Sequence, residues 1–326
     1  MRNIFPFLQL VRFPNVFVLL ADILTVAFLL TSLELLPAQN LAPFIAAGFG
    51  AVCLYWGGMV LNDVFDFMED SVLRPDRPLP SGRIALPTAI KTGWGLLAAG
   101  WALCVLTGIG TRNLTSALSV IGLATVLCAC IVMYDARLKN TPMGPFLMGL
   151  CRGLNVLLFL AFMASETPNA AAPLFLYPMA LSVFITGVTF YARNETIDAP
   201  EVGICRPGLG MLVFSVLLLV GGVAILLPFP TQLNATLLGS VQPLFAFQPW
   251  RWPTLLGILT LWLAFRAVMA YFQDVTAVRR VVKQALFLVF LLDAALTLVV
   301  AGLPCAMVIL ALFVLASLIG KWVYST

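Results

Sequence analysis

Long runs of apolar residues dominate this chain and restrict what it can fold into. A helix needs about 20 apolar residues to cross a hydrocarbon core of about 30 Å. Lipid offers the backbone no hydrogen-bond partner, so a spanning chain is helical unless it closes a barrel, and alternating ten-residue strands are not seen in the sequence. The runs therefore predict an all-α, polytopic transmembrane helical bundle of nine or ten helices. They lie at 15–33, 43–62, 88–108, 115–133, 144–163, 173–191, 208–228 and 252–272, and 284–323 is long enough for two spans.

Composition agrees with a membrane protein and excludes some chemistry. Of the residues, 62% are hydrophobic and 10% are charged, whereas soluble domains carry about 25% charged residues. The seven cysteines fall mostly inside the apolar runs, so we interpret them as small buried side chains. The chain has no histidine, so any metal must be held by oxygen atoms, which suits Mg²⁺. The net charge of +4 gives no nucleic-acid signal.

Basic residues set the expected orientation. If the N-terminus is cytoplasmic, the outer loops carry only Arg112 and Arg251 among the basic residues. The first apolar run is too long for a cleavable signal peptide, so we expect it to remain as an anchor. Gly302 and Pro304 are expected to form a hairpin between the last two spans. We expect an integral protein of the bacterial inner membrane, surrounded by membrane lipid, with its N-terminus and active-site loops in the cytoplasm.

A cluster of charged residues at 61–83 follows the second apolar run. Asn62, Asp66 and Asp70 are spaced i, i+4, i+8, and they share one face if the helix continues past the membrane surface. Three oxygen ligands in one stripe suit a divalent cation, which relieves the repulsion between the carboxylates. Asp63 could replace Asn62 in an i, i+3, i+7 set, so the choice of ligands stays open at this point.

A second acidic cluster lies at 190–203, after the sixth run. Asn194, Glu195 and Asp198 repeat the pattern N-[DE]-x-x-D of the first cluster. Four spans separate the two clusters, so they have the same sidedness and can face each other across a central cavity open to the cytoplasmic side. Two facing clusters can hold two metal ions around one diphosphate.

Basic residues near the two clusters are candidates for binding phosphate. Arginine makes bidentate contacts with phosphate, and lysine acts as a point charge. The predicted contacts to substrate at this end of the bundle are Arg74, Arg77, Arg137, Lys139, Arg193 and Asn194.

These motifs resemble those of the UbiA superfamily of intramembrane prenyltransferases. NDVFDFMED at 62–70 matches the N-D-x-x-D-x-x-x-D signature of that family, and RPDRPLPSGR at 74–83 resembles its R-P-x-R-P-L-x-S-G continuation. VRFPN at 11–15 and YDARLK at 134–139 extend the resemblance, which covers the chain from 10 to about 300. YARNE at 191–195 is similar to less-characterised members such as the EboC group.

The resemblance implies a single prenyltransferase domain over 1–326 and a reaction. Such an enzyme passes the prenyl group of an isoprenyl diphosphate to a lipophilic or aromatic acceptor in the membrane, with Mg²⁺ as cofactor. By the same resemblance the metal ligands are Asn62, Asp66 and Asp70 for one ion and Asp198 for the other. Glu195 or Glu201 is expected to complete the second set. The implied catalytic residues are Asp66, Asp70, Asp198, Lys139, which holds phosphate, and Tyr134, which stabilises the carbocation.

The second cluster departs from the pattern of the family. The usual motif is D-x-x-x-D, but the matching pair here is Asn194 and Asp198, so one carboxylate has become an amide. A second hypothesis therefore stays open, in which the chain is a catalytically impaired UbiA-like protein that handles or transports lipid.

Polar residues inside or beside the spans add a third group of candidates, since such residues usually face a cavity or a partner. Asn15 and Asn155 are predicted to contact the acceptor. Arg152 is expected either to pair with Asp22 or Asp293 or to contact the acceptor.

Overall fold

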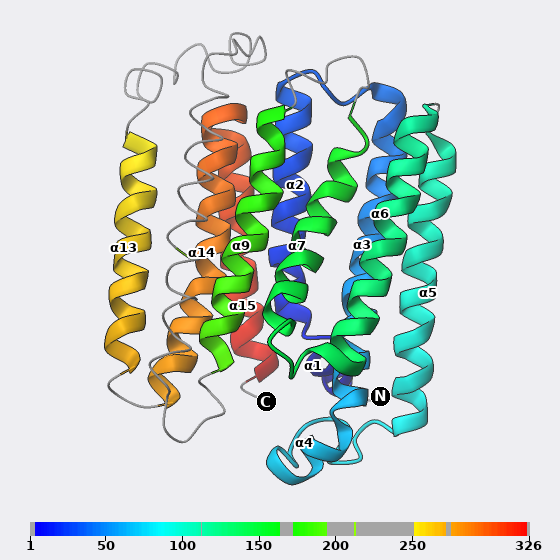
Figure 1. Cartoon of the computed structure of the whole chain (residues 1–326), viewed down its shortest axis with the longest axis vertical. Coiled ribbons are helices and arrows are strands. Elements are labelled where there is room, and N and C mark those ends of the chain that lie inside the picture. Colours follow the sequence, from blue (N-terminus) through cyan, green and yellow to red (C-terminus); the bar gives the residue numbers. More distant parts are fainter. Residues whose placement is uncertain are drawn as a thin grey trace.

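The computed structural model describes residues 4–111, 113–163, 172–193, 212, 251–271 and 275–324. This part of the chain is helical and contains no strand. Nine of its helices run along the bundle: α2 (Val16–Ser32), α3 (Ala38–Phe65), α5 (Leu86–Gly110), α6 (Leu114–Met133), α7 (Gly144–Leu160), α9 (Leu176–Ala192), α13 (Arg251–Tyr271), α14 (Val275–Ala301) and α15 (Leu303–Tyr324). Short elements join them at one end: α1 (Phe5–Leu10), a 3-10 turn (Phe13–Asn15), α4 (Phe67–Leu73) and a π-helical turn (Tyr134–Leu138). Both ends of the chain lie at this end of the bundle, which we call the motif end (Figure 1).

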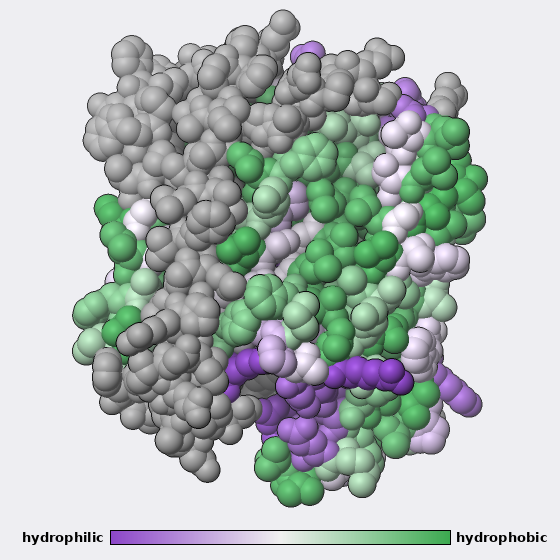
Figure 2. Space-filling view, viewed as in Figure 1, coloured by the Kyte–Doolittle hydropathy of each residue, from purple (hydrophilic) through white to green (hydrophobic). Residues whose placement is uncertain are grey.

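The helices are apolar enough to make the chain an integral membrane protein. Among the described residues, six helical segments have the length and composition to cross a membrane, and three shorter apolar helices accompany them. Hydrophobic residues cover much of the visible side of the bundle, and hydrophilic residues gather at the motif end (Figure 2). The predicted run at 208–228 lies outside the described residues apart from Leu212, so the count of nine or ten helices stays a prediction.

The predicted hairpin between the last two spans is confirmed. α14 ends at Ala301 and α15 begins at Leu303, with Gly302 alone between them. The φ angle of Gly302 is 88°, a left-handed conformation that glycine adopts without steric cost. The chain therefore reverses direction within one residue, and the two helices pack side by side.

Glycines bring α3 and α5 into backbone contact. A Cβ atom on Gly100 would lie 2.6 Å from the carbonyl oxygen of Gly50, and one on Gly57 would lie 2.8 Å from the amide nitrogen of Leu97. Small residues of this kind let membrane helices approach closely, so dispersion contacts accumulate along the whole pair. The helix that carries the first acidic motif is thereby fixed against its neighbour.

Candidate functional site

The first acidic motif lies where α3 leaves the bundle. α3 ends at Phe65, α4 begins at Phe67, and Asp66 is the single residue between them. The backbone keeps the four-residue hydrogen-bond step across this break, with Asp66 N bonded to Asn62 O at 3.0 Å and Asp70 N bonded to Asp66 O at 2.8 Å. The condition that the helix continues past Phe65 is therefore met with a break at one residue, Asp66.

Two polar contacts join the end of α3 to the end of α6. The Nδ2 atom of Asn62 donates a hydrogen bond to Oδ1 of Asp135 at 3.1 Å. One helical turn further on, the ammonium of Lys139 forms an ion pair with Asp66. From the first contact to the second, the chain advances four residues on each side, from Asn62 to Asp66 and from Asp135 to Lys139. Residues of the predicted first motif and of YDARLK therefore meet in register. Tyr134, predicted to stabilise a carbocation, is the first residue of the π-helical turn that contains Asp135 and is followed by Lys139.

Arginines hold the other two carboxylates of the motif. Arg77 forms an ion pair with Asp70, and its Nη1 also lies 3.5 Å from Oδ1 of Asp63. Arg12, which adopts a left-handed conformation between α1 and the 3-10 turn, places Nη2 3.3 Å from the same Asp63 oxygen. Asp63 therefore joins the N-terminal segment, through Arg12, to the loop after α4, through Arg77.

A cavity opens beside these ion pairs. It has a volume of about 510 Å³, and its walls come from α1, α3 and the loop after α4. Its charged lining residues are Arg12, Asp63, Arg74, Asp76, Arg77 and Arg83. Arginine exceeds aspartate on its walls, so the cavity suits an anion.

Burial makes the charges of the site interact strongly. The side chains of Asp63 and Asp70 are 8% and 7% exposed, and those of Lys139 and Asp66 are 16% and 19% exposed. Partial burial lowers the pKa of the Lys139 ammonium, and Arg12 lowers it further, whereas Asp63 opposes this change. Water screens such pairs poorly, so an incoming cation or anion has to exchange partners with them.

The other predicted residues at the motif end have different surroundings. Arg193, at the end of α9, donates a hydrogen bond to the carbonyl oxygen of Lys139 at 2.9 Å and another to that of Thr141. It therefore supports the Lys139 loop from behind. Arg74, Arg137 and Asn15 are exposed. Asn194, Glu195 and Asp198 lie outside the described residues, so their place relative to the first motif stays a prediction.

A separate polar cluster lies inside the bundle, where α2, α7, α9 and α14 meet. Arg152 places Nε 2.5 Å from Oδ2 of Asp22 and donates from Nη2 to the carbonyl oxygen of Val18 at 2.9 Å. Tyr177 donates to Asp293 at 2.7 Å, and both aspartates are fully buried. Of the two predicted partners, Arg152 thus forms its ion pair with Asp22. Asn155, predicted to contact the acceptor, is also buried, and its Nδ2 has no hydrogen-bond partner among the described residues.

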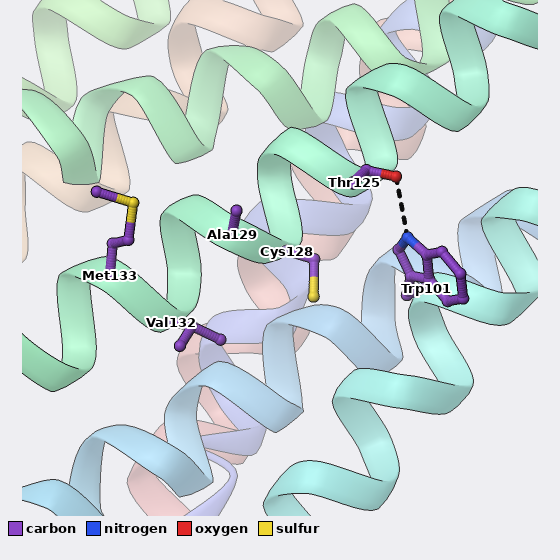
Figure 3. A pocket seen from close by; sticks show the side chains of 6 residues that line it. All are labelled: Trp101, Thr125, Cys128, Ala129, Val132 and Met133. Atoms are coloured by element: carbon purple, nitrogen blue, oxygen red, sulfur yellow. Dashed lines mark hydrogen bonds between the residues drawn. The ribbon is translucent and has the colours of Figure 1, made fainter.

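A groove on the outside of α5 and α6 carries little chemistry. Its volume is about 420 Å³, and it is lined by Trp101, Thr125, Cys128, Ala129, Val132 and Met133 (Figure 3). The one hydrogen bond drawn there joins Nε1 of Trp101 to Oγ1 of Thr125 at 3.1 Å. No predicted site residue lines this groove, so the candidate site is the charged motif end.

Two residues that contact the first motif, Asp135 and Arg12, were not predicted. Asp135 and Arg12 contact motif residues directly, at Asn62 and Asp63. The sequence held a signal for Asp135, because it precedes Lys139 by the same four residues that separate Asn62 from Asp66. No pattern in the sequence marks the pairing of Arg12 with Asp63.

Known proteins resemble this chain in sequence and in fold. The sequence profile of the UbiA prenyltransferase family matches residues 23–271. The chain is 38% identical over 116 residues to the digeranylgeranylglyceryl phosphate synthase of Methanopyrus kandleri, a match that covers 34% of this chain and 38% of that relative. It is 26% identical over 198 residues to the synthase of the same name from Methanobrevibacter smithii, covering 60% and 64%. Both matches therefore span less than two thirds of the relative's length.

Two solved structures share the fold. One comes from work on digeranylgeranylglyceryl phosphate synthase in membranes, with a TM-score of 0.56 and 21% identity over 93% of this chain and 100% of the other. The second is the apo structure of a UbiA homolog from Aeropyrum pernix K1, with a TM-score of 0.59 and 19% identity over 84% and 96%. Because the family profile covers most of the chain, this chain belongs to the UbiA prenyltransferase family.

Proposed function

We propose that the protein transfers a prenyl group from an isoprenyl diphosphate to a lipophilic or aromatic acceptor within the membrane. The observation that carries the proposal is the ion pair of Asp66 with Lys139, next to that of Asp70 with Arg77. Each pair couples a motif carboxylate, suited to a cation, with a basic side chain suited to phosphate. A magnesium diphosphate presents both charges at once, so it can take the place of each partner.

The donor set at this end fits Mg²⁺. It consists of hard oxygen atoms from two aspartates and the Asn62 amide, and Mg²⁺ in proteins usually takes one or two carboxylates and completes its shell with water and phosphate. Among the described residues no three Asp, Glu, Cys or His side chains gather closely enough to form a full cage. The proposal therefore assigns Asn62, Asp66 and Asp70 to a cation that the diphosphate shares. When bound, Mg²⁺ supplies positive charge to the departing diphosphate.

The chain's own residues do the rest of the work in this mechanism. Lys139, Arg77 and Arg74 hold the phosphate oxygens as the bond from carbon to oxygen breaks, and their fixed positive charge stabilises the leaving group. We assign Tyr134 to the carbocation, and the apolar bundle excludes the water that would otherwise quench it. Asp198 and Glu195 are proposed to complete the site from the second cluster.

The acceptor and the surroundings of the site are also part of the proposal. The relatives are named for synthesis of a glyceryl phosphate lipid. Glyceryl phosphate lipids should therefore be tested as acceptors for this chain together with aromatic ones. We keep the assignment of Asn15, Asn155, Arg137, Arg193 and Asn194 to substrate contacts. The single domain over 1–326, the central cavity and the cytoplasmic position of the motif end also stay proposals.

The test uses the full chain in lipid nanodiscs. Labelled prenyl diphosphates of several lengths are supplied with Mg²⁺ and with aromatic and glyceryl phosphate acceptors, and both diphosphate release and prenylated product are measured. We expect Mg²⁺-dependent release that Asp66→Ala abolishes. Glu69→Ala is the matched control, because Glu69 lies in the same motif but is exposed and forms no ion pair within the described residues.

Two results would count against the proposal. Release that is equally lost in Asp66→Ala and Glu69→Ala would remove the special role of the ion-paired carboxylates. Tight binding of the diphosphate without release, under every combination of acceptor and metal, would instead favour the impaired lipid-handling or transport protein.

A further inference from the structure

Asp135 controls which end of the Asn62 side chain faces the motif. The amide of asparagine has a donor nitrogen on one branch and an acceptor oxygen on the other. A carboxylate can only accept hydrogen bonds, so Asp135 requires the nitrogen, and Nδ2 of Asn62 is the atom that lies 3.1 Å from its Oδ1. The amide oxygen of Asn62 is therefore turned away from Asp135.

Asp135 is buried at a cost that packing does not explain. The residue is 5% exposed, and its Oδ2 atom has no hydrogen-bond partner among the described residues. A buried polar atom without a partner destabilises a fold, and an apolar residue of similar size would avoid that cost. Groups retained against stability are concentrated at functional sites.

The surroundings of Asp135 hold its carboxylate in place. The backbone around it forms a π-helical turn (Tyr134–Leu138), in which Lys139 N bonds to Tyr134 O at 3.0 Å. π-turns inside helices occur frequently at functional sites. Lys139, which directly follows this turn, pairs with Asp66. A shift of Asp135 would therefore also disturb a residue of the proposed phosphate site.

We infer that Asp135 is a positioning residue, which locks the Asn62 amide so that its oxygen, and not its nitrogen, is offered to the divalent cation. This inference rests on the proposed function. With the amide reversed, the NH₂ group would point its positive hydrogens at the cation and the ligand would be lost. Groups that orient metal ligands from behind commonly change metal affinity by about 10–100-fold when they are removed.

The test measures metal binding directly. Full-length protein in nanodiscs is titrated with Mn²⁺ in the presence of a non-cleavable thiolo analogue of a prenyl diphosphate, and bound Mn²⁺ is followed by electron paramagnetic resonance. We expect Asp135→Leu to weaken Mn²⁺ binding by about 10–100-fold. Asp135→Asn keeps one acceptor oxygen but allows the wrong amide orientation, so we expect a smaller loss. Asp135→Asn also carries the test if Asp135→Leu fails to fold.

A double-mutant cycle separates positioning from a general structural role. If Asp135 acts through Asn62, replacing it by leucine in an Asn62→Ala background should change Mn²⁺ binding by less than about 2-fold, because contacting residues are not additive. The unfolding temperature of Asp135→Leu is expected to be unchanged or raised, since the substitution removes a buried oxygen that has no partner among the described residues. Lowered thermal stability together with an equal loss of binding in both backgrounds would overturn the inference.

The outcomes also distinguish this inference from the proposed function. If the unmodified protein binds no Mn²⁺ with the analogue, the proposed function fails. If it binds Mn²⁺, and Asp135→Leu binds equally tightly, the proposed function stands and the role of Asp135 is refuted.

Discussion

Two glycines of α5 should respond in opposite ways to the same added methyl group. At Gly100 the new Cβ would lie 2.6 Å from Gly50 O and 2.7 Å from Leu54 N, both of which are backbone atoms of α3. At Gly95 it would meet nothing within 4 Å, and this position is exposed. The pair therefore forms a matched comparison within one helix.

The expected magnitude follows from these distances. Non-bonded heavy atoms rest at about 3.5–4.0 Å, so at Gly100 the two helices must part by about 1 Å along their closest contact. Forcing extra volume into a packed interface typically costs about 1–3 kcal/mol. Alanine at Gly95 should be neutral or add up to about 1 kcal/mol, the usual difference in helix propensity. The two variants should thus differ by about 1–4 kcal/mol in their free energy of unfolding.

Unfolding in mixed micelles, followed by the loss of helical circular dichroism as sodium dodecyl sulfate is added, measures this difference. Gly100→Ala should unfold at a lower detergent fraction than the parent, and Gly95→Ala at the same or a higher one. Equal curves for the two variants would refute the conclusion that α3 and α5 are in backbone contact.

Three further predictions concern the charges. Lys139→Met should slow diphosphate release by about 100–1000-fold, the usual effect of losing one donor that stabilises a developing anion. Lys139→Arg should retain part of the release rate. Unchanged release in Lys139→Met would contradict the phosphate role. Arg152→Met should destabilise the protein by about 3–5 kcal/mol in the same micelle assay, because it leaves Asp22 unpaired inside the membrane. The double variant Asp22→Leu with Arg152→Met should recover most of that loss, and failure to recover would show that the ion pair itself is needed. Removal of divalent ions with a chelator should abolish binding of the thiolo analogue in a calorimetric titration, and Mg²⁺ should restore it; binding that persists would argue against metal-bridged recognition.

Much of the fold could be predicted because hydropathy alone defines a spanning helix. The described helices coincide with the predicted runs, and Gly302 provides the expected reversal. The break at Asp66 was not predicted, since the spacing of Asn62, Asp66 and Asp70 is equally compatible with a continuous helix. Periodicity reports which residues share a face, but it does not report whether the axis continues.

The partners within the site could be predicted only in part. The residue types of the first motif indicated a cation and phosphate, but their pairing depends on the register between α3 and α6, which no local pattern encodes. Lys139 was assigned to phosphate, and the structure adds that it reaches Asp66. The contact of Arg12 with Asp63 needs a left-handed residue before the first span, which sequence spacing does not indicate.

The polar cluster inside the bundle links helices that are synthesised at different times. α2, with Asp22, leaves the ribosome early, whereas Arg152 follows in α7 and Asp293 arrives in α14. A carboxyl group is costly in hydrocarbon until its partner is present. Asp22 therefore gains its ion-pair partner only when α7 has been made, and Tyr177 gains Asp293 only when α14 has been made.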